Sequence, residues 1–477
     1  MSRRSNISRV AIKAMGLFGG VQVVGILCSI VRTKLVALWI GPLGVGLFGL
    51  FNQALDTINT AASLGVRQSS VRDISQAAER NEGRRLSRLI AVVRKWSLWL
   101  GLAGATLTLA LAPLLSQWTF GSSEHLWGFV ALSIAVLLTT LASGEQAVLQ
   151  GLAKLRRLAS ATLWGTVFGL VVSIPLFYFL REESILPSII AYAAGCAFFA
   201  LYFRDKEHPA VQVSTKDTVT IGRDFVRLGI YMTIGNFVTI LAGYVFNAWL
   251  NVQAGTDEVG LYQAGYTLVY KYTGLVLTAL GMEYYPRLSR VAGSRIRLCA
   301  FVSQEINIAM MVMAPIAALF FLLRGPVVWL LYSPEFNVIV TFASWVMMGT
   351  VMRAFSWCVA FVILAKGSGK IYLMTETLSA IIGLALNVVF YRLWGLTGLG
   401  VSFLAWYVAY SVIVLVVYVY TYRLRLTPAC LFNLCYTLAI TGAVFWAVER
   451  QLWLLAVALS LIAVVVSLAQ AKRKFFG

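Results

Sequence analysis

The sequence predicts an all-α polytopic membrane protein that crosses the bilayer about fourteen times. Three observations lead to this fold class: an apolar composition, apolar runs that recur along the whole chain, and a one-sided distribution of basic residues between those runs. Of the 477 residues, 60% are hydrophobic and only 12% are charged, whereas soluble domains carry roughly 25% charged residues. Most of the chain must therefore face lipid, and no separate soluble domain is expected.

The apolar runs place the helices, because each has the length of about twenty residues that a helix needs to cross a hydrocarbon core. The first helices are predicted at residues 12–40, 43–64, 89–113, 126–150, 158–180 and 184–203. After a polar stretch, the remaining helices are predicted at residues 225–250, 257–283, 300–323, 337–365, 372–391, 396–421, 430–448 and 452–470. Arg32 and Lys34 interrupt the first run, which therefore predicts a retained helix and not a cleaved signal peptide.

The 39 lysines and arginines indicate the topology. With a cytoplasmic N-terminus, the loops on the opposite side hold only Arg181, Arg324, Arg392 and Arg450. Cytoplasmic loops are enriched in basic residues, so both termini are predicted to be cytoplasmic. Omitting the last two helices would preserve this bias, and about twelve helices remain the alternative. Because the basic residues follow the topology, the net charge of +20 does not indicate a nucleic-acid partner.

An internal repeat divides the predicted helices into two lobes. GPLGVGLF at residues 41–48 precedes the second helix, and GTDEVGLY at residues 255–262 precedes the eighth. An even number of helices separates the copies, so they share one orientation, as in transporters whose pseudo-symmetric six-helix lobes enclose a central cavity. Chance recurrence of a Gly-rich turn is the alternative. We predict an N-terminal lobe at residues 1–203, a cytoplasmic linker at 204–224, a C-terminal lobe at 225–422, and a helix pair with a basic cytoplasmic tail at 423–477.

Polar residues inside the first two helices mark the candidate cavity, because a charge at the bilayer centre costs roughly 2.5–3.5 kcal/mol on insertion scales. The first helix carries Arg32 and Lys34, and the second carries Asn52, Asp56 and Asn59 on one face. Such a polar face cannot face lipid, so we expect it to line the cavity. As alternatives, the two cations can snorkel to the headgroups, and Asp56 can serve as a structural salt-bridge partner.

The second lobe contributes two further cations. Lys271 lies among tyrosines in the eighth predicted helix, and Arg353 lies in the tenth between Trp345 and Trp357. Aromatic faces pack on sugar rings and basic groups bind phosphate oxygens, so the combination suits an anionic, sugar-bearing ligand. Ordinary aromatic packing is the alternative. An excess of cations over mid-membrane carboxylates also favours an anionic cargo over a hydrophobic cation.

Two carboxylates and one basic segment lie near the predicted cytoplasmic face. Glu145 and Glu376 are expected to pair with local basic residues, and the alternative is a role in gating or ion coupling, which is also open for Asp56. Residues 67–96 are basic and partly amphipathic. They are expected to signal topology or to lie along the anionic lipids of the inner leaflet.

The sequence has no motif of a known enzyme class. It contains no Walker A, GxSxG or HExxH pattern, and its six cysteines lack metal-ligand spacing. We therefore expect no metal, cofactor or ATP hydrolysis, and transport driven by a proton or sodium gradient, the membrane potential or polysaccharide assembly. A membrane-embedded polysaccharide polymerase or ligase is the alternative from another class, and it would require a large outer loop or paired His and carboxylate groups.

The run SIVRTKLVALWIGPLGVGLFGLFNQALDTINTAASLGVRQSSVRDIS at residues 29–75 resembles the N-terminal region of Wzx-type O-antigen and polysaccharide translocases. These belong to the multidrug/oligosaccharidyl-lipid/polysaccharide exporter (MOP) superfamily. The shared features are a basic residue before a GPxGxG turn and a polar second helix that ends in a Gly-Val basic segment. The resemblance implies a flippase of the bacterial inner membrane that moves undecaprenyl-pyrophosphate-linked oligosaccharide between leaflets by alternating access.

The same resemblance implies cavity roles for Arg32 and Lys34, with Lys271 and Arg353 opposite them. It implies a polyprenyl-pyrophosphate-linked glycan as partner, together with polysaccharide polymerase and chain-length machinery. The last two predicted helices depart from the plan of most Wzx proteins and are similar to those of lipid II flippases. A lipid II-type cargo is therefore an alternative, as is a drug/cation antiporter on the same fold with Asp56 as its site.

Overall fold

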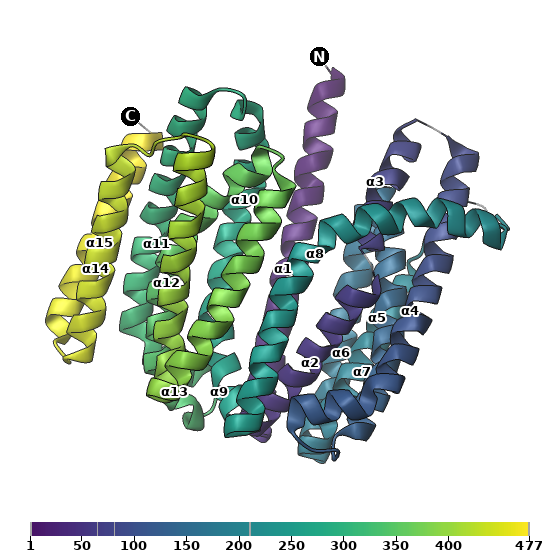
Figure 1. Cartoon of the computed structure of the whole chain (residues 1–477), viewed down its shortest axis with the longest axis horizontal. Coiled ribbons are helices and arrows are strands. Elements are labelled where there is room, and N and C mark those ends of the chain that lie inside the picture. Colours follow the sequence, from purple (N-terminus) through teal and green to yellow (C-terminus); the bar gives the residue numbers. More distant parts are fainter. Residues whose placement is uncertain (1, 64, 81, 209–210, 476–477) are drawn as a thin grey trace. The chain divides into compact units, whose positions relative to one another are not determined.

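The computed structural model describes residues 2–63, 65–80, 82–208 and 211–475. These residues form helices joined by short turns, and the described part contains no strand (Figure 1). Within it, nine segments are long and apolar enough to cross a membrane, judged by length and composition only. Two of these segments, Leu155–Tyr202 and Gly369–Thr421, each hold two helices in succession. The predicted all-α, polytopic membrane fold is confirmed.

The helices follow one another along the chain in the order that the apolar runs predict. The first part of the chain forms α1 (Ser2–Trp39), α2 (Pro42–Ser63), α3 (Val66–Glu79), α4 (Gly83–Phe120), α5 (Leu126–Gly151), α6 (Leu155–Leu180), the 3-10 turn η1 (Arg181–Ser184), α7 (Ile185–Tyr202) and α8 (Thr215–Ala254). The second part forms α9 (Thr256–Tyr266), the π-helical turn η2 (Thr267–Lys271), α10 (Tyr272–Val291), α11 (Arg295–Leu331), the 3-10 turn η3 (Pro334–Val338), α12 (Ile339–Ala365), α13 (Gly369–Val416), the π-helical turn η4 (Val417–Thr421), α14 (Pro428–Glu449) and α15 (Trp453–Phe475).

The helix α13 consists of two helices separated by a break. Trp394 has φ −136° and Gly395 has φ 59° and ψ −140°, which are not helical values. A positive φ is accessible to glycine at little cost, so Gly395 permits the chain to turn there. The break falls where the sequence predicts the boundary between the helices at 372–391 and 396–421. The final pair α14 and α15 is also present, and both helices are apolar enough to span a bilayer.

The helix α8 begins earlier than the apolar pattern predicts. It starts at Thr215, inside the predicted linker, and the Ser214 side chain accepts a hydrogen bond from the backbone N–H of Lys216 at 3.3 Å. Serine at this position satisfies a free helical N–H, and Asp217 in the first turn suits the helix dipole. These polar first turns pack on α3 and α4 (Figure 1), and the Trp96 indole N–H donates to the Thr218 carbonyl at 2.9 Å.

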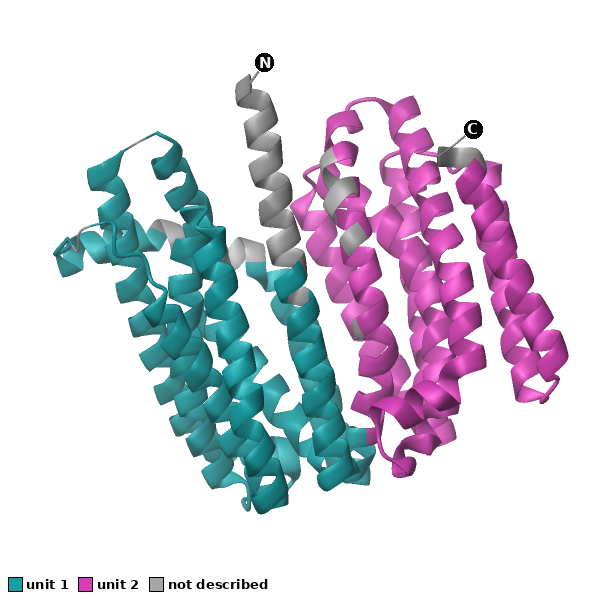
Figure 2. Ribbon diagram, turned by 180° about the vertical axis from the view of Figure 1, so that it is seen from behind, with its two compact units in different colours: residues 1–260 teal, residues 261–477 magenta. Residues whose placement is uncertain are grey.

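The chain divides into two compact units, unit 1 (Met1–Gly260) and unit 2 (Leu261–Gly477), which Figure 2 colours separately. Unit 1 therefore includes α8 and the start of α9. The two lobes were predicted from a sequence repeat, whereas the two units are defined by compactness. The units therefore do not test the lobes, which stay a prediction.

The amphipathic helix α3 is held on unit 1 by a local core. Ile74 and Ala77 are buried against Leu89 and Val93 of α4 and Val148 of α5. Burying one such aliphatic side chain contributes roughly 1.5–3 kcal/mol. The opposite face of α3 stays exposed and carries Arg72, Gln76 and Glu79, so this helix is amphipathic, as the sequence predicts for part of residues 67–96.

Candidate functional site

Arg32 of α1 lies in an aromatic cradle inside unit 1. Its Cζ is 4.8 Å from the ring centre of Phe48 on α2 and 5.0 Å from that of Tyr192 on α7. The Nε atom is buried, and it has no hydrogen-bond partner among the described residues. Desolvated cation–π contacts contribute about 2 kcal/mol, which offsets part of the cost of a buried charge. The guanidinium keeps an unused donor, which an anionic ligand could satisfy.

The other polar residues predicted near Arg32 have different surroundings. Lys34 is half-buried and Asp56 is exposed, and both make polar or electrostatic contacts of their own. The Asn52 amide donates to the Phe48 carbonyl of the preceding turn at 2.6 Å. Asn52 therefore satisfies one of its two N–H donors within α2. The cavity roles of these three residues stay predictions.

Asn59 joins α2 to α5. Its amide nitrogen donates to Thr139 Oγ1 at 2.9 Å, and its amide oxygen accepts from Thr140 Oγ1 at 3.3 Å. Elsewhere on α2, the Gln53 side-chain oxygen accepts from the Asn247 amide of α8 at 2.6 Å. Hydrogen bonds between membrane helices contribute roughly 0.6 kcal/mol on average. The polar face of α2 thus packs against α5 at Asn59, and Gln53 joins α2 to α8 from another side of the helix.

Arg353 of α12 lies on a tyrosine in unit 2. Its Cζ is 3.5 Å from the ring centre of Tyr270, and its Nη1 donates to the Tyr270 backbone carbonyl at 3.0 Å. Tyr270 belongs to the π-helical turn η2. Such a turn disturbs the regular helical hydrogen bonding, which makes a backbone carbonyl accessible to a side chain from another helix. The turn therefore supplies both the ring and the acceptor that hold Arg353.

More aromatic rings surround this arginine. Tyr266 stacks on Tyr270 with 4.6 Å between ring centres, and Phe403 of α13 lies 6.0 Å from Tyr270 and 4.8 Å from Tyr407. Gly349 permits the approach of α13, because a Cβ at this position would lie 2.5 Å from the Phe403 ring. Arg353 thus lies among three tyrosines and a phenylalanine.

The tryptophans that flank Arg353 in the sequence pack elsewhere. Trp345 contacts Phe445 of α14 at 5.1 Å between ring centres, and Trp357 contacts Phe361 at 4.6 Å. Tyrosines from α9 and η2 therefore take the place expected for these tryptophans. Lys271 ends the π-helical turn, but its side chain lies outside the described residues, and its cavity role stays a prediction.

Glu376 has a tyrosine as its partner within the described part of unit 2. The Tyr410 hydroxyl donates to Glu376 Oε1 at 2.5 Å. This differs from the basic partner that the sequence predicts. The physical reason is the break at Gly395, which folds the second half of α13 back on the first and brings Tyr410 opposite Glu376. The gating or coupling role of Glu376 stays a prediction.

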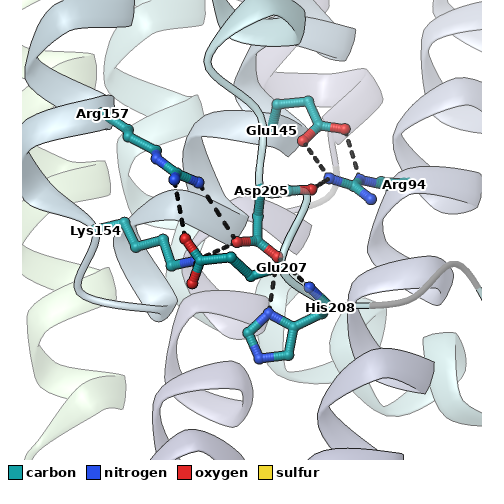
Figure 3. Close-up of polar contacts among 7 residues, drawn as sticks. All are labelled: Arg94, Glu145, Lys154, Arg157, Asp205, Glu207 and His208. Atoms are coloured by element: carbon teal, nitrogen blue, oxygen red, sulfur yellow. Dashed lines mark hydrogen bonds and ion pairs between the residues drawn. The ribbon is translucent and has the colours of Figure 1, made fainter.

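Glu145 of α5 pairs with a basic residue, as expected. Arg94 of α4 donates through Nε to Oε1 at 2.7 Å and through Nη2 to Oε2 at 3.0 Å, and Nη2 also donates to the Asp205 backbone carbonyl at 3.1 Å (Figure 3). A bidentate arrangement of this kind fixes both side chains in one geometry. Glu145 thereby links α5, α4 and the segment after α7, and a further gating role stays a prediction.

Asp205 is the centre of a larger ion-pair cluster, which Figure 3 shows. Its fully buried carboxylate pairs with Lys154 and accepts from His208 Nδ1 at 2.8 Å, and Arg157 Nη1 lies 3.9 Å away. Lys154 also pairs with the exposed Glu207 at 2.6 Å. Burial alone would raise the pKa of Asp205, but the hydrogen bonds from Lys154 and His208 outweigh it and lower the pKa to about 2. The cluster fastens the segment before α8 to the turn between α5 and α6.

Replacing Asp205 with asparagine is expected to destabilise unit 1 in a pH-dependent way. Because folding lowers the pKa of this carboxyl from about 3.9, its charge stabilises the fold above pH 4, and this contribution is lost as the pH falls from about 4 to 2. The expected contribution at neutral pH is about 2 kcal/mol.

Thermal unfolding of the detergent-solubilised protein checks this expectation. The difference in Tm between the natural chain and Asp205→Asn should stay constant from pH 5 to 8 and shrink below about pH 4. The matched change at the exposed partner, Glu207→Gln, should shift Tm much less. A difference that grows on acidification would contradict the assignment.

The described residues contain no group of three or more His, Cys, Asp and Glu side chains that could hold a metal ion. The six cysteines are all free, and Cys358 and Cys430 are buried in unit 2. These buried thiols pack as small core residues.

Sequence reasoning missed several residues that position the candidate site. Tyr192 on α7 is far along the chain from Arg32 on α1, and Asn247 on α8 is far from Gln53 on α2. Phe48 lies on α2, the helix that follows α1. A single sequence gives no signal for such pairs, whereas covariation among homologues could have found them. The cluster around Asp205 had a weak signal, because residues 204–208 alternate acidic and basic side chains just after a predicted helix.

Comparison with known proteins assigns the chain to a family. The model of the family described as "Polysaccharide biosynthesis protein" matches residues 35–341. Among curated proteins, the lipid III flippase of Escherichia coli (strain K12) is 22% identical over 354 residues, which cover 72% of this chain and 82% of that protein. The lipid III flippase of Shigella flexneri matches to the same extent.

Solved structures share the fold. The lipid II flippase MurJ in its inward closed conformation has a TM-score of 0.73 at 10% identity, covering 98% of this chain and 100% of that one. An inward-facing multidrug resistance transporter of the MATE family has a TM-score of 0.70 at 16% identity, covering 82% of this chain and 92% of that one. These matches confirm the predicted likeness in fold to transporters of the MOP superfamily. The chain belongs to the family of polysaccharide biosynthesis proteins and has the fold of MOP superfamily transporters.

Proposed function

We propose that this protein is a flippase that turns undecaprenyl-pyrophosphate-linked oligosaccharide, an O-antigen or related repeat unit, from the cytoplasmic to the periplasmic leaflet. Family membership and the lipid III flippases among its relatives support a lipid-linked glycan as cargo. The fold shared with a lipid II flippase and MATE transporters supports transport by alternating access. The chain acts as a transporter and not as an enzyme.

The observation that carries the proposal is the surroundings of the Arg32 side chain. A guanidinium that lies between two aromatic rings, with a buried Nε donor that has no hydrogen-bond partner among the described residues, is poorly satisfied by the protein itself. Its planar donors match phosphate oxygens, and charge-assisted bonds to phosphate are about twice as strong as neutral ones. We assign the pyrophosphate to Arg32, with Lys34 of the same unit as a further proposed contact. Lys271 is a proposed cargo contact of unit 2.

The group around Arg353 supports a contact with the sugars. Tyrosine faces pack on the apolar faces of sugar rings while their hydroxyls exchange hydrogen bonds with sugar hydroxyls. Arg353 donates to the Tyr270 carbonyl, and a guanidinium has five N–H donors, so others could meet a glycan oxygen. Glu376, held by Tyr410, is the proposed ion-coupling carboxylate of this unit, and Asp56 is that of unit 1.

The exposed basic residues of α3, of the turn after it and of the start of α4 support an encounter with anionic lipid headgroups. They are Arg67, Arg72, Arg80, Arg84, Arg85 and Arg88. Near a negatively charged leaflet, each basic residue contributes about 1 kcal/mol of attraction. The inner membrane, with both termini cytoplasmic, is the proposed location, and polymerase and chain-length machinery are the proposed downstream partners.

Deletion of the gene in its host tests the proposal. Complete polyprenyl-linked repeat units should accumulate on the cytoplasmic leaflet while surface polysaccharide is lost, and analysis of the extracted lipids would identify the glycan. Accumulation of the peptidoglycan precursor would establish a lipid II-type cargo instead. Normal glycans on both leaflets would favour drug/cation antiport, and unpolymerised units on the outer leaflet would favour a polymerase or ligase.

A further inference from the structure

A row of aromatic rings in unit 2 runs along one side of α9 into the π-helical turn η2. Tyr262 lies 5.7 Å from Tyr266 between ring centres, and Tyr266 stacks on Tyr270 at 4.6 Å. Neighbours in this row are four residues apart, which places their side chains one above the other on a helix. Arg353 of α12 lies on the Tyr270 ring, with its Cζ 3.5 Å from the ring centre. The guanidinium therefore closes one end of the row.

Gln263 lies at the opposite end of this row. It follows Tyr262 directly and precedes Tyr266 by three residues, and side chains three residues apart are neighbours on a helix surface. The side of α9 that carries Gly265 packs on α12, because a Cβ added to Gly265 would collide with the Phe342 ring. Gln263 comes two residues earlier, which is roughly 200° around the helix. Its side chain therefore points away from this contact with α12.

The amide of Gln263 has an unused donor. Its Nε2 atom is buried and has no hydrogen-bond partner among the described residues. Buried polar groups in folded proteins nearly always have a hydrogen-bond partner, so a donor in this condition indicates a partner from outside the chain. A hydroxyl group both donates and accepts, and a sugar hydroxyl can therefore satisfy the amide whichever way its oxygen and nitrogen are turned.

The distance between the amide and the guanidinium suits a glycan of more than one sugar. Gln263 and Tyr270 are seven residues apart, which corresponds to roughly 10 Å along a helix. Phe403 of α13 packs edge-on against Tyr266 and Tyr270 at 5.9 and 6.0 Å between ring centres, and it fixes the rings between the two ends. A single sugar ring is shorter than this row, so two different sugars are needed to contact both ends.

We propose that Gln263 and Arg353 are the two ends of a sugar-binding track, in which Gln263 hydrogen-bonds a hydroxyl of one sugar and Arg353 contacts another sugar of the same glycan. The track rests on the proposed function, because it adds a contact to the glycan cargo. It makes Gln263 a residue that determines specificity. A glycan without the matching hydroxyl leaves the buried amide unpaired, and sites of this kind discriminate strongly against such a ligand.

Binding of three lipids to the purified full chain tests the track. They are the complete lipid-linked glycan from the deletion strain, the same lipid trimmed enzymatically to its first sugar, and undecaprenyl pyrophosphate. Gln263→Leu removes the amide, and it should lower the affinity for the complete glycan about tenfold while leaving that for undecaprenyl pyrophosphate unchanged. With the one-sugar lipid, at most one of Gln263→Leu and Arg353→Ala should lose affinity. Gln304→Leu is the matched control, because Gln304 is exposed on α11.

Two results would overturn the track. One is an unchanged affinity of Gln263→Leu for the complete glycan, and the other is an equal loss in Gln263→Leu and Arg353→Ala for the one-sugar lipid. If Gln263→Leu does not accumulate in the membrane, Gln263→Asn replaces it. This variant withdraws the amide by one methylene group and should weaken binding of the complete glycan alone. A natural chain that binds none of the three lipids would contradict the flippase proposal itself, so the two failures are distinguishable.

Discussion

Replacing Arg32 with alanine is expected to abolish most of the transport of lipid-linked glycan. Hydrogen bonds to charged groups contribute about 1.5–3 kcal/mol, so losing the pyrophosphate contact should lower the transport rate roughly tenfold to a hundredfold. The variant should still insert, because the cradle of Phe48 and Tyr192 loses a buried charge that was costly to hold. Surface polysaccharide in a complemented deletion strain measures the loss.

Two further variants separate the role of Arg32 from a general loss of charge. Arg32→Lys keeps the positive charge but loses the planar donor fork, so transport should fall to an intermediate level. Arg156→Ala removes an exposed arginine of unit 1 that lies outside the proposed headgroup-binding residues, and it should leave transport within about twofold, as surface changes usually do. Unchanged surface polysaccharide in Arg32→Ala, at equal protein level, would refute the pyrophosphate assignment.

Arg353→Ala is expected to reduce transport about as much as Arg32→Ala does. Its effect on binding should depend on whether the cargo carries sugars. If Arg353 and the tyrosines around it bind the sugars, Arg353→Ala should lower the affinity for the complete glycan about tenfold. It should bind undecaprenyl pyrophosphate without sugars as well as the natural chain does. Binding of the two lipids to purified protein, measured side by side, gives this ratio.

The controls for Arg353 use residues of the same unit. Arg295 also donates to a backbone carbonyl, that of Arg423 at 2.7 Å, but it is exposed, and Arg295→Ala should change neither affinity. Tyr270→Leu removes the ring under Arg353 while keeping the backbone acceptor, and it should weaken binding of the complete glycan alone. Equal losses for both lipids in Arg353→Ala would contradict a sugar-reading role.

The fold could be predicted largely because membrane helices are local features. An apolar run of sufficient length has to satisfy its backbone hydrogen bonds internally, and a helix does so without reference to distant residues. Even the break within α13 coincides with the short gap that the sequence leaves before Gly395. The start of α8 was missed because its first turns are polar, so hydropathy gives no signal there. The signal that was present is Ser214, which caps the helix.

The candidate site was predictable only one residue at a time. The sequence alone identifies Arg32 and Arg353 as unusual, because placing a charged side chain inside the bilayer costs free energy. Their surroundings depend on which helices pack together, and this is why Tyr192 was not foreseen and why Tyr270 replaces the neighbouring tryptophans around Arg353.

The most direct test of the central claim is flipping by the purified protein. Proteoliposomes are loaded with the polyprenyl-pyrophosphate glycan extracted from the deletion strain, and the fraction of glycan open to an added glycosidase or lectin is followed with time. The account predicts that the natural chain exposes glycan from the inner leaflet, whereas Arg32→Ala and protein-free vesicles leave it protected. Protection that is equal in all three preparations would contradict the proposal that this protein moves lipid-linked glycans.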